Sequence, residues 1–357
     1  MDLDNFEQEV LNESLSSATH EISKVEAEHI VASRYGISGR ALPLSSERDQ
    51  NFKIVATGGA EYIFKLSNAG EDFSVAQFQV EALLHISRAD AHLPVPRVIA
   101  SLDGQTCLSI PFNTLDGNFI RTARLLSFLP GVPLHMVRRT VTQRRALGTV
   151  LGQLGLALRD FSHAAAGHKL AWDIKNVGEL RELLSHIPSS SHRDLAQYFF
   201  ENFEENAAAH LPSLRAQVVH NDLNPYNVVV DAGDQDRVAG IFDFGDMVYT
   251  SLINDVAIGA CYHVSTGERA LETAAEFVGA YHAVVPLEPI EVDLLFDLMA
   301  ARFLATVAIT GWRAARYPQN SAYILRNNPS AWDGLENLNS LSRKQAQSIL
   351  RRACNME

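Results

Sequence analysis

Apolar and polar positions follow two different patterns along this chain, and the change between them divides it into two parts. Near the start, residues 4–35 carry apolar side chains at helical spacing, which predicts one or two amphipathic helices. Short apolar runs at residues 52–56 and 62–66 then flank the turn Thr57-Gly58-Gly59-Ala60 and predict a β-hairpin. The pattern also predicts a helix over residues 74–88 and strands over residues 98–102, 106–110 and 123–129. The first part is therefore rich in β-structure with one central helix.

Beyond Pro133 the spacing of apolar residues becomes mainly helical. The predicted helices cover residues 141–163, 177–184, 192–210 and 290–316, and a further one starts at Asp255. Residues 216–249 interrupt this pattern, because two short apolar runs, 228–230 and 239–242, flank a polar turn. We therefore expect an α+β protein with an N-terminal lobe at residues 1–129 and a helical C-terminal lobe at residues 130–357.

Composition and charge narrow the class of protein. The chain has 357 residues, long enough for two lobes, and its 46% hydrophobic and 20% charged residues are typical of a soluble globular protein. Its formal charge of −12 repels a phosphate backbone, so nucleic acid is not expected as a partner. A cationic or zwitterionic small molecule fits this charge better.

Cysteine usage and the first residues indicate the compartment. Cys107, Cys261 and Cys354 are an odd number, widely spaced, with no paired ligand pattern, so we expect neither a disulfide framework nor a structural zinc site. Residues 1–30 are acidic and lack the apolar segment of a signal peptide, and the apolar runs are too short to span a membrane. These features predict a cytoplasmic protein without a membrane partner.

One polar segment carries the strongest chemical signal. Asp222 and Asn227 lie in His220-Asn221-Asp222-Leu223-Asn224-Pro225-Tyr226-Asn227, which precedes a short apolar run, and Asp243 follows the next run in Phe242-Asp243-Phe244-Gly245-Asp246. Phosphoryl transfer needs a carboxylate for the attacking hydroxyl, oxygen ligands for Mg²⁺ and a cation on the phosphates. If the two apolar runs pair as a hairpin, Asn227 and Asp243 lie at one edge with Asp222 close by. The segment can therefore supply the carboxylate and the oxygen ligands.

This segment resembles the catalytic segment of the aminoglycoside phosphotransferase and choline kinase superfamily, relatives of protein kinases. His220, Asp222, Asn227 and Asp243 match the superfamily pattern, with Gly245 also in place. The resemblance implies a bilobal protein-kinase-like fold with the nucleotide between an N-terminal sheet-and-helix lobe and a helical C-terminal lobe. It further implies that Asp222 accepts the proton of the substrate hydroxyl, and that Asn227 and Asp243 hold Mg²⁺. His220 is expected to be a packed loop residue, and Asp255 to cap a helix and brace the loop.

The same resemblance assigns the nucleotide-binding residues of the first part. Lys65, in an apolar strand, matches the phosphate-binding lysine, and Glu81 in the following helix is its expected ion-pair partner, with Glu71 and Asp72 as rivals. The loop at residues 45–51 would cover the phosphates. The backbone of Ser127 and Leu129, in the predicted linker, would bind the purine edge of ATP or GTP.

Two further segments narrow the resemblance to the subgroup that contains hydroxylysine kinase and the kinase modules fused to class III aminotransferases. They are residues 168–173 and 242–249, and they suggest a small amine or amino acid acceptor, with hydroxylysine or homoserine as models. The residues expected to contact the acceptor are Trp172, Asp173, Asp246 and Arg302. Arg302 could pair with a substrate carboxylate.

Several alternatives remain open at this point. An aminoglycoside phosphotransferase or a choline-type kinase carries the same motif, and a non-catalytic pseudokinase has the same fold. A protein kinase is disfavoured, because the chain lacks a His-Arg-Asp loop and leaves no room for an activation loop between Asp243 and Asp255. The sequence does not decide the acceptor, the purine or the oligomeric state.

Overall fold

The computed structural model describes residues 21–46, 49–68, 70–114, 117–267 and 269–356. Contacts within the chain divide it into two compact units. The first unit extends to Pro130 and also includes His163–His168. The second unit comprises Gly131–Ser162 and continues from Lys169. The sequence did not predict that the short segment His163–His168 belongs with the first unit.

The first unit consists of an antiparallel sheet and helices on both of its faces. Its elements are α2 (Lys24–Tyr35), β1 (Gly39–Leu44), β2 (Gln50–Ala56), β3 (Glu61–Leu66), α3 (Phe73–Ala89), β4 (Val98–Ile99), β5 (Leu108–Thr114), β6 (Gly117–Ser127) and the 3₁₀ turn η2 (Ala164–Gly167). The strands follow the order β1-β2-β3-β6-β4, and β5 pairs with β6. The predicted hairpin is confirmed as β2 and β3, with Val55 opposite Glu61.

Two sequence predictions in this unit change. The helical stretch predicted from residue 4 is described only from α2 onward, which begins with a capping box between Ser23 and Glu26; residues 4–20 lie outside the described residues. The strand predicted over residues 98–102 is limited to β4. It ends early because Ser101 begins a tight turn, in which its backbone N–H donates to Gln105 O and its carbonyl accepts from Gly104.

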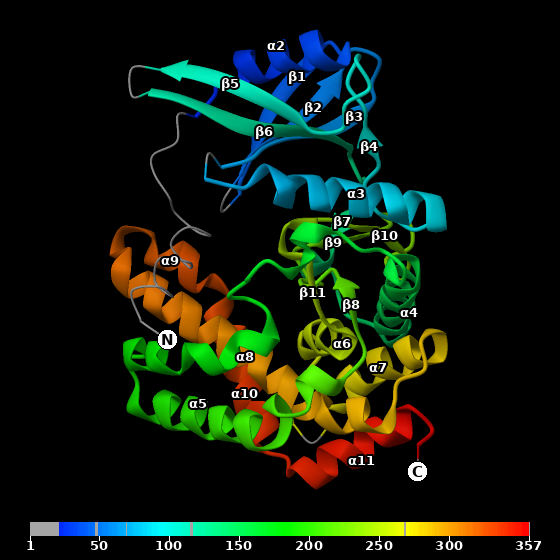
Figure 1. Ribbon diagram of the computed structural model, residues 1–357. Helices are drawn as coiled ribbons and strands as arrows, with labels where there is room; N and C mark the ends of the chain where they lie inside the picture. Colours follow the sequence, from blue (N-terminus) through cyan, green and yellow to red (C-terminus); the bar gives the residue numbers. More distant parts are fainter. Residues whose placement is uncertain (1–20, 47–48, 69, 115–116, 268, 357) are drawn as a thin grey trace. The chain divides into compact units, whose positions relative to one another are not determined.

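The alternation of side chains along β3 and β6 places different chemistry on the two faces of the sheet. Phe64 and Leu66 belong to the buried core that includes Val31 of α2. Lys65 and Arg124, which are opposite one another in the register, point to the other face, where Arg124 Nη2 donates to Gln79 of α3. Figure 1 shows α2 and α3 on opposite sides of this sheet.

The second unit is mainly helical. Its helices are α4 (Val141–Leu158), α5 (Ser190–Phe203), α6 (Leu252–Cys261), α7 (Glu272–Val284), α8 (Pro289–Arg316), α9 (Ser321–Ile324), α10 (Asn328–Asn339) and α11 (Arg343–Ala353). Short 3₁₀ segments are η1 (Leu134–Met136), η3 (Ile174–His186), η5 (Leu211–Ser213), η6 (Phe244–Asp246), η7 (Pro318–Asn320) and η8 (Leu325–Asn327), and η4 (Glu204–Ala208) is a π-helical turn. Its strands are β7 (Val132–Pro133), β8 (Ala216–Val219), β9 (Val228–Val230), β10 (Val238–Ile241) and β11 (Val248–Ser251).

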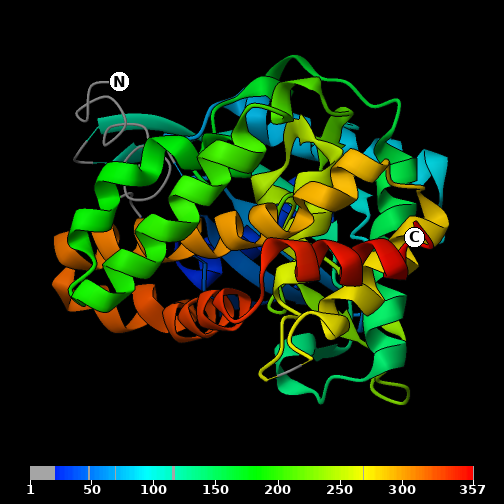
Figure 2. The same ribbon diagram turned by 90° about the horizontal axis from the view of Figure 1, so that it is seen from below.

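Helix α8 forms the centre of this unit. Helices α5, α6, α10 and α11 and the segment η3 pack around it, so almost every residue between Glu291 and Arg313 is buried (Figures 1 and 2). A helix that is buried on all sides in a globular protein belongs to a large core. No helix in the described part of the chain combines the length and apolar character needed to cross a membrane.

Two small antiparallel sheets, β10-β9-β7 and β11-β8, interrupt the helices beside the polar motif. Strand β9 pairs with β10 so that Val228 lies opposite Ile241, and the backbone N–H of Phe242 donates to Asn227 O. The predicted hairpin is therefore confirmed, and it brings Asn227 next to the residue before Asp243. Strands β8 and β11 form a second antiparallel pair that the sequence did not predict.

The helices of the second unit differ from prediction in their ends and their type. Helix α4 ends at Leu158, and the helix predicted over residues 192–210 is α5, which runs into the π-helical turn η4. The helix predicted over residues 177–184 is the 3₁₀ segment η3. Helices α7, α10 and α11 lie where the sequence analysis placed no element.

Candidate active site

Asp222 lies in the loop between β8 and β9 (residues 220–227, here called the catalytic loop), and both of its carboxylate oxygens are hydrogen-bonded. The Nδ2 atoms of Asn224 and Asn227 donate to Oδ2 at 2.8 and 2.7 Å. On the other side, Arg302 Nη2 of α8 lies 2.7 Å from Oδ1. Donors on both sides fix the rotamer of the carboxylate, as a base that must meet a substrate hydroxyl requires.

The surroundings of Asp222 also set its basicity. Burial raises the pKa of Asp222 to about 7, while the Arg302 guanidinium opposes this shift and the carboxylate of Asp246 adds to it. A carboxylate with a pKa near neutrality is a better proton acceptor at cellular pH than one in water. The loop therefore provides a carboxylate suited to general-base chemistry.

Buried polar contacts hold the backbone of the catalytic loop. His220 is fully buried; its Nδ1 accepts the backbone N–H of Asp222, and its Nε2 lies 3.2 Å from Phe242 O. Asn221 has a positive φ of 64°, and its N–H donates to Asp255 Oδ1 at 2.8 Å. Burial raises the pKa of Asp255 to about 6, against the hydrogen bonds from Asn221 and His220.

These contacts bear on two predictions about the loop. The prediction that His220 is a packed, hydrogen-bonded residue is confirmed, because the side chain is buried and both ring nitrogens have polar partners. Burial also lowers the pKa of its ring. Asp255 braces the loop as expected. It does not cap a helix, however, because it lies in the first turn of α6, whose N-cap position is Ser251.

Asn227 and Asp243, the predicted metal ligands, flank the same edge of the β9–β10 hairpin. Asn227 Nδ2 donates to the carbonyl and carboxylate of Asp222, which leaves Oδ1 as the oxygen that can face a cation. Asp243 is exposed and has a left-handed φ of 61°. Gly245 lets this carboxylate approach closely, because a Cβ at Gly245 would lie 3.2 Å from Asp243 Oδ1.

The donor set at this edge fits Mg²⁺. Asn227 and Asp243 offer hard oxygen ligands. Asp246 adds negative charge nearby, since the carboxylates of Asp243 and Asp246 both raise the pKa of Asp222. Within the described ranges, no three His, Cys, Asp or Glu side chains form a metal-binding group. That finding is compatible with Mg²⁺ bound by one carboxylate, one amide and phosphate oxygens.

Lys65, the predicted phosphate-binding cation, lies on the α3-facing side of β3. Its Nζ is 3.7 Å from Asp49 Oδ2, and the same carboxylate lies 3.3 Å from Arg124 Nη2. Glu81 of α3 accepts a hydrogen bond from Gln77 and lies 3.7 Å from His163 Nε2. Asp49 was not predicted as a partner of Lys65, and the ion pair between Lys65 and Glu81 stays a prediction.

The predicted purine-binding segment begins at the end of β6. The backbone N–H of Ser127 donates to Arg97 O, and its hydroxyl accepts from Arg97 N, so these two groups are used within the first unit. Leu129 lies beyond the strand and is half-buried. Contact of Ser127 and Leu129 with a nucleotide stays a prediction.

Three of the predicted acceptor residues are engaged inside the second unit. Arg302 lies over the Trp172 ring, 5.4 Å from its centroid, and within 3.4 Å of the Tyr262 hydroxyl. Asp173 is fully buried, begins η3 as its N-cap and accepts a hydrogen bond from Thr250. These contacts give Asp173 a structural role within the second unit. Acceptor contacts by Trp172, Asp173, Asp246 and Arg302 stay predictions.

Sequence reasoning missed two members of the Asp222 network. Asn224 stands two residues after Asp222, and its position inside the motif is the signal that could have revealed it. Tyr262 follows α6, and nothing in its local sequence indicates that its hydroxyl approaches Arg302.

A sheet-and-helix unit with a lysine on its sheet, followed in the chain by a helical unit with a held aspartate, has the groups that a kinase of the small-molecule type requires. A family model described as phosphotransferase enzyme family matches residues 40–286. The chain therefore belongs to the phosphotransferase enzyme family. It transfers a phosphoryl group from a nucleotide donor, typically with a divalent metal, to a hydroxyl of a small molecule.

Several known kinases are similar to this chain in sequence or in structure. The chain is 25% identical over 355 residues to the hydroxylysine kinase of Mus musculus, and the match covers 94% of each protein. An amicoumacin kinase structure aligns with a TM-score of 0.66 at 16% identity, over 91% of this chain and 97% of that one. A microcompartment-associated aminopropanol kinase aligns with a TM-score of 0.60 at 16% identity, over 93% and 99%. The structural similarities show the protein-kinase-like fold.

Proposed function

We propose that this chain phosphorylates the hydroxyl of a small amino acid or amino alcohol, with hydroxylysine as the model acceptor. The observation that carries the chemistry is the carboxylate of Asp222, whose two oxygens are held by Asn224, Asn227 and Arg302. The match to hydroxylysine kinase over nearly the whole chain supports the choice of acceptor.

In the proposed mechanism, Asp222 receives the proton of the acceptor hydroxyl while the oxygen attacks the γ-phosphorus in line. The P–O bond to the β-phosphate breaks, and the nucleoside diphosphate leaves with the bonding electrons. Arg302 and the two asparagines keep the carboxylate in the orientation that this proton transfer needs. Lys65, in the first unit, would supply a positive charge to the phosphates.

Asn227 and Asp243 would hold Mg²⁺, which when bound neutralises negative charge on the phosphates. We propose Mg²⁺ with ATP or GTP as the donor, and a cytoplasmic location, where these nucleotides are available. The backbone of Ser127 and Leu129 would bind the purine edge, and Glu81 would orient Lys65.

The test is a steady-state panel with Mg²⁺ and either ATP or GTP. The acceptors are hydroxylysine, homoserine, aminopropanol, choline and an aminoglycoside, and product is detected as phosphorylated acceptor rather than as released diphosphate. Turnover highest with hydroxylysine or homoserine supports the proposal. Turnover confined to the aminoglycoside or to choline would contradict it, and no transfer to any acceptor would revive a non-catalytic role.

Substitution of Arg302 tests whether this residue binds the carboxylate of the acceptor directly. If Arg302 binds a carboxylate, Arg302→Ala lowers kcat/KM for hydroxylysine far more than for its decarboxylated amino alcohol. If Arg302 acts only by holding Asp222, both values fall by the same factor. The ratio of the two kcat/KM values separates these roles, whatever the absolute loss of activity.

A further inference from the structure

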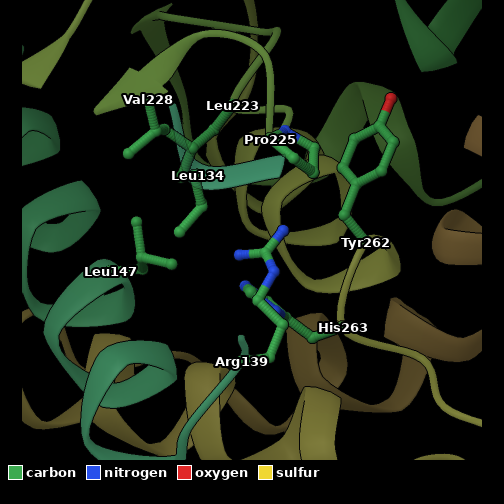
Figure 3. Close-up of a pocket in the computed structure, with 8 residues that line it drawn as sticks. All are labelled: Leu134, Arg139, Leu147, Leu223, Pro225, Val228, Tyr262 and His263. Atoms are coloured by element: carbon green, nitrogen blue, oxygen red, sulfur yellow. The ribbon is translucent and has the colours of Figure 1, made fainter. Parts of the chain in front are cut away.

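The segment formed by β7 and η1 (residues 132–136) runs beside the catalytic loop within the second unit. Strand β7 pairs antiparallel with β9, with Pro133 opposite Val229. In an antiparallel pair, the residues after Pro133 lie next to the residues before Val229, which belong to the catalytic loop. Figure 3 shows Leu134 and Pro225 on the lining of one small cavity. The segment therefore follows the catalytic loop beyond the end of the strand pairing.

His135 makes two contacts with the catalytic loop. Its backbone N–H donates to Pro225 O at 3.2 Å. Its imidazole stacks on the Tyr226 ring, with centroids 4.3 Å apart and an interplanar angle of 27°. His135 is exposed and Tyr226 is 46% exposed, so the pair buries less apolar surface than a pair in the core. What the stack does restrict is the position of Tyr226, which lies in a segment that is neither helix nor strand.

Tyr226 is linked to the catalytic carboxylate through Asn224. The backbone N–H of Tyr226 donates to Asn224 Oδ1 at 2.7 Å, and Nδ2 of the same amide donates to Asp222 Oδ2 at 2.8 Å. An amide group is planar and has its donor and acceptor on opposite sides, so the position of Tyr226 N–H sets the direction of Asn224 Nδ2. The same turn also places the predicted metal ligand, because the N–H of Asn227 donates to Asn224 O at 3.0 Å.

A second stacked pair in the same unit shows the purely structural case. His192 of α5 lies on the Trp332 ring of α10, with centroids 4.1 Å apart and an interplanar angle of 11°. Neither helix carries a residue of the candidate active site. The stack of His135 on Tyr226 differs because Tyr226 lies between two asparagines whose amides donate to Asp222.

We propose that His135 is a positioning residue for phosphoryl transfer: its stack on Tyr226 holds the turn at residues 224–226 and so keeps the Asn224 amide directed at Asp222. The proposal rests on the proposed function, because it takes Asp222 as the base. In this role His135 acts through Asn224 and needs no contact with the acceptor or the nucleotide.

The experiment measures kcat, KM and melting temperature with the acceptor that the wild type phosphorylates fastest. His135→Ala should lower kcat about tenfold at an unchanged KM for the acceptor, because a misdirected base meets the hydroxyl less often in a productive geometry. His135→Phe keeps an aromatic ring over Tyr226 and should restore kcat to within about twofold of wild type. His192→Ala is the matched control, since it removes the other stack and should lower the melting temperature without lowering kcat.

A double-mutant cycle tests the route from His135 to the base. In Asn224→Ala the amide is absent, so adding His135→Ala should cause no further loss of kcat. Losses that multiply would show that His135 acts by another route and would overturn the proposal. A kcat of His135→Ala equal to wild type, or an equal loss in His135→Phe, would also overturn it.

Amide hydrogen exchange separates this proposal from the proposed function, because it needs no acceptor. Exchange in residues 223–228 should be faster in His135→Ala than in wild type and His192→Ala. Unchanged exchange would overturn the proposal even in an active enzyme. Absence of transfer by the wild type to any acceptor, with faster exchange in His135→Ala, would refute the proposed function and leave His135 as the residue that holds the turn.

Discussion

At the scale of one residue, Asp222 is a carboxylate that the fold holds in a fixed orientation. Two amides approach one oxygen and a buried guanidinium approaches the other, while burial raises the pKa toward neutrality. The guanidinium and the Asn224 amide lower the pKa of the carboxylate, but the effect of burial is larger. The carboxylate is thus fixed in place and still able to accept a proton.

Asp222→Asn keeps the shape of this side chain and removes the proton acceptor. We expect kcat to fall by roughly two to four orders of magnitude, the usual contribution of a general base, with nucleotide affinity within a few-fold of wild type. Glu182→Gln, which neutralises an exposed carboxylate on η3, is the control and should leave kcat unchanged. Near-wild-type turnover of Asp222→Asn would remove this residue from its role.

The proposed binding of Mg²⁺ by Asp243 is also best tested by substitution with the corresponding amide. Alanine at this site would add backbone strain, because φ is 61° and asparagine tolerates this region far better. Asp243→Asn should therefore fold normally but lose the Mg²⁺-dependent gain in nucleotide affinity, since a neutral amide is a weaker ligand for a hard cation. Titration calorimetry with and without Mg²⁺ measures this gain, and a gain equal to wild type would contradict the assignment.

The sequence predicts a chemical role for each of these residues, but it does not predict their backbone conformations or their distant contacts. The spacing from Asp222 to Asn227 and the position of Asp243 after a strand were enough to predict the hairpin edge. The left-handed conformations of Asn221 and Asp243 depend on tertiary contacts, such as the hydrogen bond from Asn221 to Asp255. Arg302 is 80 residues from Asp222, and no local pattern encodes that pairing.

At the scale of elements, the catalytic loop is held in an unfavourable backbone conformation by buried partners. The positive φ of Asn221 costs free energy for any residue with a Cβ, and Asp255 offsets that cost by accepting its N–H. Both side-chain polar atoms of Asn221 are buried without hydrogen bonds in the described chain, so the side chain contributes little besides its tolerance of this conformation.

A pair of substitutions at Asn221 tests this account. Asn221→Ala should unfold with a free energy about 1–2 kcal/mol lower than Asn221→Gly, because alanine is strained at positive φ and glycine is not. Urea denaturation gives both values, and kcat should follow the same order. The same two changes at Asn355, exposed and at φ 54°, are the control: they should alter stability without altering kcat. Equal stability of the two Asn221 variants would show that the loop relaxes.

Helices and strands were predicted correctly where a hydrophobic pattern extends over a long segment. The prediction failed where a strand pairs with another strand that is distant in the sequence. Helices α3 and α8 and the hairpin β2–β3 were all predicted from local patterns. Strands β8 and β11 are four residues each and pair across the whole catalytic segment, so neither shows a hairpin signal. The segment η3 has helical spacing, yet only its backbone geometry reveals that it is a 3₁₀ helix.

At the scale of the whole molecule, the predicted chemistry divides between the two compact units. Lys65 belongs to the first unit, whereas Asp222, Asn227 and Asp243 belong to the second. The sequence predicted a boundary near residue 130 from the change in periodicity. It did not predict that His163–His168 returns to the first unit, because stacking of His163 on Phe78 is a contact between distant segments.

If one bound nucleotide draws on residues from both units, a change in either unit must weaken its binding. Saturating nucleotide with Mg²⁺ at about 100 times its Kd should stabilise the wild type by roughly 2.7 kcal/mol. Lys65→Met should weaken binding about tenfold or more, which removes at least about 1.4 kcal/mol of that stabilisation, while the nucleotide-free melting temperature stays near wild type. Lys24→Met, at an exposed position on α2, controls for the lost positive charge and should keep the full ligand-induced shift.

The measurement is the shift in melting temperature that ATP or GTP causes in the wild type, Lys65→Met and Lys24→Met. Asp243→Asn, measured in the same way, provides the comparison from the second unit. A full shift in Lys65→Met beside a reduced shift in Asp243→Asn would confine nucleotide binding to the second unit and remove Lys65 from the phosphates.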